Sequence, residues 1–165
     1  MSGLNEKTYP DIVKTRVAEA LSPMLDVFHS IGEAPLHLVR YVYAEGCLER
    51  IVLSFGRTSL VALADEDDDT IVLWTASTES LEISAEVDMR LATTLWEPFV
   101  GKQFGWGYVV VNQQGYCDGL LLGFADIRPK VFLQVVASSI EVRSISEARP
   151  DGLGPADTPV LNTGQ

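Results

Sequence analysis

Three side chains that can do chemistry, Asn112, Tyr116 and Asp118, fall within seven residues between two strongly apolar runs. An amide, a phenol and a carboxylate at this spacing can line a small polar pocket that binds a ligand. The same stretch also has a purely structural explanation. Asn112 suits the first position of a β-turn, and Gly115 supplies the left-handed residue that a bulged hairpin needs. In that hairpin Gln113 lies exposed at the tip.

The carboxylate of Asp118 has three alternative placements. In a regular strand it shares a face with Leu120, Leu122 and Phe124, and facing the core it requires donors or a counter-ion. There it either fixes the turn through nearby donors or lines the polar pocket. A β-bulge would instead turn the side chain toward solvent.

A second group of carboxylates occupies residues 65–69, in the stretch DEDDD. A calcium loop requires glycine at its sixth position, where this chain has Thr70, so the stretch indicates a solvated turn that discourages aggregation at a sheet edge. Residues 33–99 carry 13 acidic and only 4 basic side chains. This acidity favours a basic partner, and Asp67 and Asp68 are the candidate contacts.

Other reactive groups are sparse or badly spaced. His29 and His37 have no partner at metal-ligand spacing, and the chain has no phosphate-binding loop or hydrolase motif, so we expect no metal and no cofactor. Cys47 and Cys117 lie far apart in apolar surroundings, which predicts buried thiols in a reduced compartment. The net charge of −11 and the lack of a basic cluster argue against nucleic acid or a membrane surface as partner. With no secretory signal and no apolar run near the ~20 residues of a membrane span, we expect a cytoplasmic protein.

The hydrophobic pattern predicts an α+β fold, in which an N-terminal helix packs on a mostly antiparallel sheet. Apolar residues spaced by three or four predict the helix over residues 10–31. The period changes to two over residues 36–76, where short turns join strands into a meander. We expect a fifth strand at 81–87 and a short helix within 88–102, before strands return over 104–146. The sheet is expected to be strongly bent or partly closed, as in a barrel.

A change of composition near residue 146 predicts the domain boundary. Residues 1–146 are expected to form a single domain with its own core. Residues 147–165 contain three prolines, three glycines and no aromatic residue. Such a segment cannot bury enough apolar surface to offset its ordering entropy, so we expect a flexible, disordered tail.

Two tryptophans, a Gly-Lys pair, the hairpin segment and a later strand form a pattern in the second half of the chain. They are Trp96, Gly101, Lys102, Trp106, residues 112–119, Ala137, Ser138 and Ile140. In this pattern the chain resembles a family of small, uncharacterised bacterial proteins, and the resemblance spans roughly residues 36–146. The resemblance implies a shared fold and a bacterial origin, and it carries over no activity.

Two functions remain open at this level. The first is a non-enzymatic protein-binding module, such as an immunity protein or other inhibitor that occludes a basic partner, with Trp106 or Tyr116 as the anchor. The alternative is a small-molecule-binding protein, or an enzyme of unrecognised type, with its site near Asn112, Tyr116 and Asp118. A homo-oligomer formed through a sheet edge is also open.

Overall fold

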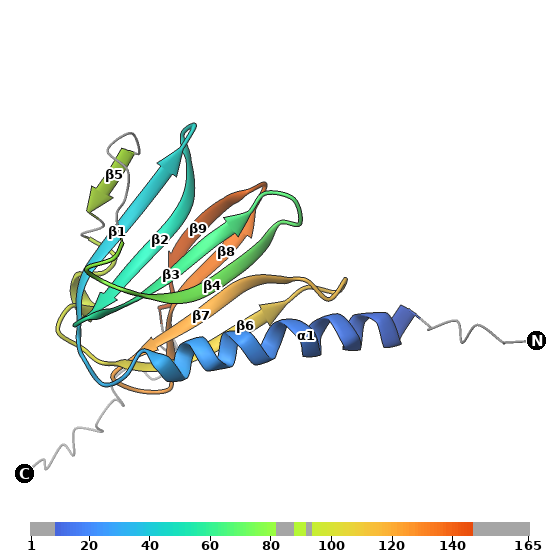
Figure 1. The fold of residues 1–165 in the computed structure, drawn as a ribbon, viewed down its shortest axis with the longest axis horizontal. Helices are drawn as coiled ribbons and strands as arrows, with labels where there is room; N and C mark the ends of the chain where they lie inside the picture. Colours follow the sequence, from blue (N-terminus) through green and yellow to red (C-terminus); the bar gives the residue numbers. More distant parts are fainter. Residues whose placement is uncertain (1–8, 82–87, 92–93, 147–165) are drawn as a thin grey trace, which may run out of the picture.

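A computed structural model describes residues 9–81, 88–91 and 94–146, which form one α-helix, a short 3-10 helix and nine strands (Figure 1). The helices are α1 (Tyr9–Ser30) and η1 (Glu97–Phe99). The strands are β1 (Leu36–Ala44), β2 (Cys47–Phe55), β3 (Thr58–Asp65), β4 (Thr70–Ser77), β5 (Asp88–Leu91), β6 (Phe104–Val111), β7 (Cys117–Phe124), β8 (Pro129–Val136) and β9 (Ser139–Ser144). No helix in these ranges has the length and apolar character that crossing a membrane requires.

The strands form two antiparallel sheets, with the orders β4-β3-β2-β1-β5 and β6-β7-β8-β9. The sheets pack face to face, with β2 and β3 against β9 and β4 against β7 and β8. Helix α1 runs along the side where the edge strands β4 and β6 come together, and it contacts both (Figure 1). Among the described residues only an isolated bridge, Pro35 to Gln103, links the sheets by backbone pairing, so they do not close into a barrel.

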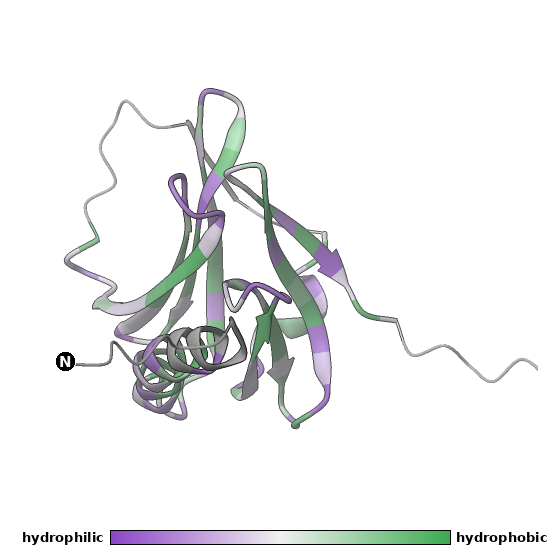
Figure 2. Cartoon of the chain, turned by 90° about the vertical axis from the view of Figure 1, so that its right-hand side faces the viewer, coloured by the Kyte–Doolittle hydropathy of each residue, from purple (hydrophilic) through white to green (hydrophobic). Residues whose placement is uncertain are grey.

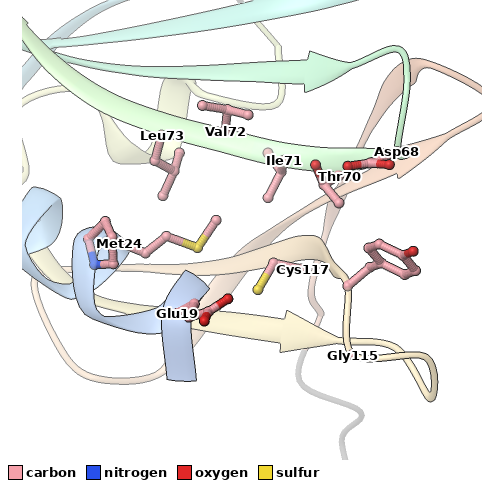
Figure 3. Close-up of a pocket in the computed structure, with 11 residues that line it drawn as sticks. Glu19, Met24, Asp68, Thr70, Ile71, Val72, Leu73, Gly115 and Cys117 are labelled. Atoms are coloured by element: carbon pink, nitrogen blue, oxygen red, sulfur yellow. The ribbon is translucent and has the colours of Figure 1, made fainter. Parts of the chain in front are cut away.

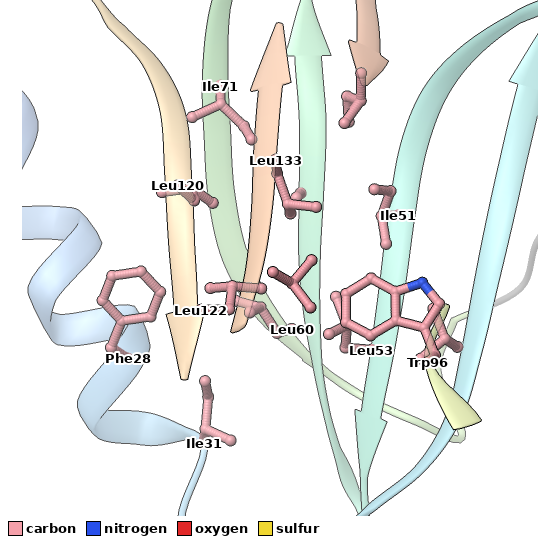
Figure 4. Close-up of a cluster of buried hydrophobic side chains, with 14 of the residues drawn as sticks. Phe28, Ile31, Ile51, Leu53, Leu60, Ile71, Trp96, Leu120, Leu122 and Leu133 are labelled. Carbon is pink, nitrogen blue, oxygen red and sulfur yellow. The ribbon is translucent and has the colours of Figure 1, made fainter. Parts of the chain in front are cut away.

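The core lies between the two sheets. Strand residues alternate between faces, so Ile51, Leu53 and Leu60 of the first sheet meet Leu120 and Leu133 of the second (Figure 4). All five side chains are fully buried, and each such burial stabilises the fold by roughly 1.5–3 kcal/mol. Hydrophilic residues concentrate at the hairpin tips instead (Figure 2).

Trp96 closes one end of the sandwich. Its buried indole N–H donates a 2.7 Å hydrogen bond to the hydroxyl of Tyr41, and its ring packs edge-on against Phe124. Burial raises the pKa of Tyr41, and the bond from Trp96 offsets part of that rise. Gly101 follows with a φ of 82°, a backbone conformation that favours glycine, and its N–H donates to the carbonyl of Leu36.

The prediction of an N-terminal helix and antiparallel strands is confirmed, but the fold is mostly β and two expectations are wrong. The strands form two sheets rather than one, because alternation specifies the faces of a strand and not its neighbours. Residues 88–91 form β5, paired with β1, and within the described part of 88–102 the helix is limited to the single turn η1. Most of the expected strand at 81–87 and the expected tail at 147–165 lie outside the described residues.

Candidate functional site

Two turns that are distant in sequence meet at the end of the sandwich opposite Trp96. One is the acidic turn, residues 66–69, between β3 and β4, and the other is the hairpin turn, residues 112–116, between β6 and β7. With the end of β8 they enclose a hollow of about 450 Å³, which we call the acidic cleft. Its lining residues are Asp67, Asp68, Asp69, Asn112, Gln114, Tyr116, Asp118, Val135, Val136 and Ala137.

The acidic turn is held by Asp65, the last residue of β3, and by Asp69. The Oδ1 atom of Asp65 accepts a hydrogen bond from the backbone N–H of Asp67, at 3.0 Å. The Oδ1 atom of Asp69 accepts one from the backbone N–H of Ser138, at 2.8 Å, which ties the turn to the β8–β9 turn of the other sheet. Glu66, Asp67 and Asp68 lie between these anchors with exposed side chains, and the last two line the cleft. The turn therefore presents three carboxylates that its own geometry does not use, two of them to the cleft.

Asn112 shapes the hairpin turn. Its Oδ1 atom accepts hydrogen bonds from the backbone N–H groups of Gln114, at 2.9 Å, and Tyr116, at 3.2 Å. The N–H of Gly115 donates to the carbonyl of Asn112, and Gly115 has a φ of 88°. The predicted turn, with Asn112 first and a left-handed Gly115, is confirmed. Gln113 is exposed at the tip, as expected for the turn, and does not line the cleft.

Asp118 is the extra residue of a β-bulge. Val110 pairs with Gly119 while the next residue, Val111, pairs with Cys117, so Asp118 has no partner across the ladder. The bulge turns Asp118 out of the core and puts Cys117 into it. Of the placements that the sequence leaves open, the β-bulge is the one observed, and the core-facing placement of a regular strand does not occur. Asp118 is half-buried in the wall of the acidic cleft, and within the described ranges its carboxylate makes no hydrogen bond or ion pair.

The two cysteines differ in exposure. Cys117 is buried, as predicted, whereas Cys47 is exposed beside the tight β1–β2 turn, so the prediction of two buried thiols is wrong for Cys47. Burial, and secondly the charge of Asp118, raise the pKa of the Cys117 thiol. A thiol with a raised pKa stays protonated near neutral pH and is a poor nucleophile.

A second hollow of about 580 Å³, which we call the side cleft, adjoins the acidic cleft (Figure 3). It lies between α1, β4 and the β6–β7 hairpin. Met24 and Cys117 face Ile71 across it and form its apolar walls. Asp68 and Tyr116 line both hollows, so one ligand can occupy the two together.

Trp106 belongs to neither cleft. Its side chain is 52% exposed and lines a separate groove of about 300 Å³ beside Phe28 of α1. Gly105 and Gly107, on either side of Trp106, allow neighbouring segments to pack closely against the backbone of β6. A Cβ atom on Gly107 would lie 2.5 Å from the ring of Phe28, and one on Gly105 would collide with the backbone oxygen of Asp126. Trp106 therefore cannot act together with the acidic cleft as one small site.

Five of the seven residues that the sequence predicts for a site line the acidic cleft. They are Asp67, Asp68, Asn112, Tyr116 and Asp118. Sequence reasoning missed Asp69, Gln114 and the end of β8. The end of β8 has one signal in the sequence, because Ala137 and Ser138, which follow it, carry part of the resemblance to the family. In the structure the backbone N–H of Ser138 donates to Asp69.

The chemistry of the acidic cleft is that of a cation receptor. It is lined by four carboxylates, two amides and a phenol, and by no lysine, arginine or histidine. His37 lies in β1, where its Nδ1 atom accepts a bond from Gly56, and His29 lines the groove beside Trp106. In the part of the chain that the structure describes, no three histidine, cysteine or acidic side chains are arranged to hold a metal ion.

Comparison with known proteins places the chain in a family. The model of DUF6334, a family of unknown function, matches residues 19–149. This range contains the acidic cleft and the turn that follows Trp96. No curated protein and no solved structure matches the chain. The predicted resemblance to an uncharacterised family is confirmed, whereas a bacterial origin stays a prediction. The chain thus belongs to DUF6334, a family of unknown function.

Proposed function

We propose that this protein is a non-enzymatic binding module that holds a basic segment of a partner protein in the acidic cleft. The observation that carries the proposal is the convergence of two distant turns. They bring Asp67, Asp68, Asp69 and Asp118 to one hollow whose lining contains no cation. Carboxylates gathered in this way repel one another, and an entering ammonium or guanidinium group relieves that repulsion.

The donors of lysine and arginine match the acceptors of the cleft. Carboxylates and amide oxygens accept hydrogen bonds from several N–H groups of one cation at once. Tyr116, half-buried where the two hollows meet, offers an apolar ring to the aliphatic stem of such a side chain. An apolar residue next to the cation would then reach Met24 and Ile71 in the side cleft.

Among proteins that bind a basic partner, an inhibitor is the kind that the acidic charge of this chain supports best. The exposed Asp67 and Asp68 would enter the basic active site of a partner enzyme and exclude its anionic substrate. The acidity of residues 33–99 would speed the encounter through electrostatic steering. An immunity protein that neutralises a toxin is one protein of this kind.

The alternative is a small-molecule-binding protein or an enzyme of unrecognised type. The size of the side cleft, about 580 Å³, favours it, because ligand pockets typically have such volumes. In that case Asp118 and Tyr116 would orient a polar ligand whose apolar part lies against Met24 and Ile71.

Titration calorimetry with defined peptides that alternate lysine or arginine with leucine tests the proposal. We expect binding at low salt, a loss at high salt, and no binding after Asp67→Asn with Asp68→Asn. The matched control is Glu79→Gln with Glu97→Gln, which removes two charges from exposed positions outside both clefts and should retain binding. Equal losses in the two double variants would show that only net charge matters.

A thermal-shift screen against metabolites separates the alternative function. A ligand that binds only the folded state raises the melting temperature. If the basic peptides do not bind, and a metabolite raises the melting temperature of the wild type but not of Asp118→Asn, the small-molecule function replaces the one proposed.

A further inference from the structure

Strand β9 ends the second sheet with a regular, unpaired edge. It has β8 on one side, and no strand of the described ranges on the other. Its ladder with β8 runs without a bulge from Val131 and Ser144 to Val136 and Ser139. An edge of this kind presents a row of backbone N–H and C=O groups that can pair with another strand.

The other edge strands are protected. Helix α1 contacts both β4 and β6, and the ladder of β6 with β7 is interrupted twice. Strand β5 has only four residues. Proteins commonly protect an edge with a covering helix, a bulge, a proline or a lysine. Strand β9, with the sequence SIEVRS, has no bulge, proline or lysine, and its two charged side chains, Glu141 and Arg143, have opposite signs.

The hairpin turn at residues 137–138 decides which backbone groups of β9 face outward. Ala137 and Ser138 have φ values of 50° and 62°, as in a two-residue turn, so Val136 and Ser139 form a hydrogen-bonded pair. Hydrogen-bonded pairs then alternate along the ladder. The residues whose N–H and C=O groups point away from β8 are Ile140, Val142 and Ser144.

We propose that β9 pairs antiparallel with β9 of a second copy of this chain, about a twofold axis at Val142. In this register the outward backbone groups of Ile140, Val142 and Ser144 pair with those of Ser144, Val142 and Ile140 of the second copy. Glu141 then lies directly opposite Arg143 of the second copy, and the symmetry repeats the contact. The edge is therefore complementary to itself in backbone and in charge.

Glu141 and Arg143 are available for this contact. They lie two residues apart on the outer face of β9, where they form an ion pair with each other within the strand. Their side chains are 44% and 60% exposed. Such an exposed pair contributes little to the stability of the single chain, so exchanging it for two cross-strand pairs costs little.

The two sheets are offset beside β9. Strand β9 packs against β2 and β3, so β1 lies beyond its free edge. Tyr41 and Tyr43, two half-buried side chains that pack edge-on, belong to the part of β1 that contacts the core. Trp96 already donates to the hydroxyl of Tyr41, so a strand added to β9 would extend the second sheet toward Tyr43.

Sedimentation velocity of the full chain over a concentration series tests the pairing. We expect a reversible dimer. Glu141→Arg and Arg143→Glu each place like charges opposite one another twice, so each should weaken the dimer at least about tenfold. In a mixture of the two variants every arginine at these positions faces a glutamate, and dimers should form again. Arg57→Glu is the matched control, because it makes the same charge change in the exposed β2–β3 turn.

Three outcomes would overturn the proposal. One is a wild-type chain that stays monomeric throughout the series, and another is a dimer that survives both charge reversals. The third is a pair of variants that each lose the dimer and do not regain it on mixing. Circular dichroism and melting curves of both variants establish that each is folded, so that misfolding does not explain such a result.

Discussion

The two ends of the sandwich differ in whether their polar groups are buried and bonded or exposed around a cleft. At one end Trp96 and Phe124 pack edge-on in an aromatic cluster, and the only polar atom of the indole donates to Tyr41. At the other end the acidic turn and the hairpin turn hold carboxylates around an open cleft. The first end is closed and its polar group is satisfied, whereas the second is open and several of its charges have no structural task.

Most of the residues that resemble the family lie at one of these ends. Trp96 and Gly101 serve the closed end, and residues 112–119 with Ala137 and Ser138 serve the open one. At the closed end Trp96 and Gly101 each have a structural explanation. At the open end Asn112 and Asp69 have one, but Asp67, Asp68 and Asp118 do not. Asp67 and Asp68 are exposed in a solvated turn, whereas Asp118 is a half-buried carboxylate. A partly buried charge without a compensating contact is typical of binding sites, so Asp118 directs attention to the open end.

The largest expected effect separates the buried tryptophan from the exposed one. Trp96→Ala removes a fully buried ring and should lower the free energy of unfolding by about 3–5 kcal/mol. Trp106→Ala removes a half-exposed ring and should cost about 1 kcal/mol or less. Urea denaturation of both variants measures the difference. Similar losses would mean that the closed end does not depend on its aromatic cluster.

Tyr41→Phe tests the single polar contact of the closed end. It leaves the buried N–H of Trp96 without an acceptor, which should lower the free energy of unfolding by about 1–3 kcal/mol. A Tyr43→Phe variant, which keeps that acceptor, is the control. A loss in Tyr43→Phe as large as that in Tyr41→Phe would show that the bond to Trp96 is unimportant.

Alkaline pH should destabilise the fold at the same tyrosine, because burial disfavours the ionised form of its phenol. The pKa values of Tyr41 and Cys117 are raised above their ordinary values of 10.0 and 9.0. Above those values the folded chain retains protons that the unfolded chain has lost, so stability is complete below about pH 9 and falls as the pH rises further. Urea titrations across this window should show a shallower fall in Tyr41→Phe than in the wild type. An unchanged slope would contradict a contribution from Tyr41.

How far the sequence predicts the fold depends on the range of the interaction. The helix of α1 and most strands follow from local periodicity, and the turn at Asn112 follows from turn chemistry. The helix expected within 88–102 does not include residues 88–91, because these form a strand by pairing with β1, and local periodicity does not show that pairing. The division into two sheets likewise depends on which strands pair with one another. The alternation of apolar and polar residues with a period of two does not specify that pairing.

The same limit applies to the site. The residue types of Asp67, Asp68 and Asp118 suggested ligands, but only the facing of the two sheets brings the acidic turn to the hairpin turn. The orientation of Asp118 depends on one bulge opposite Val110 and Val111, which shifts the alternation by one residue. Trp106 was grouped with the site because it is near in sequence, yet it lines another groove.

Within the open end, Asn112 and Asp118 should behave differently. Asn112→Ala removes the acceptor of two backbone N–H groups in a solvent-exposed turn and should cost about 1 kcal/mol of stability. Asp118→Asn should change the free energy of unfolding by no more than about 0.5 kcal/mol, because its carboxylate bonds to no described residue. Urea denaturation checks both values. A larger loss in Asp118→Asn would make this residue part of the turn rather than of a site.

The smallest effect concerns the two aspartates that the acidic turn does not use. Asp67→Asn with Asp68→Asn relieves repulsion in a chain of net charge −11, so it should leave stability unchanged or raise it by at most about 0.5 kcal/mol. Any gain should be larger at low salt than at high salt, because salt screens exposed charges. Thermal melts at two salt concentrations, with Glu79→Gln and Glu97→Gln as the control, measure it. A clear loss of stability would show that these carboxylates stabilise the open end. Both ends would then have a structural role, and the open end would lose its distinction as a candidate binding site.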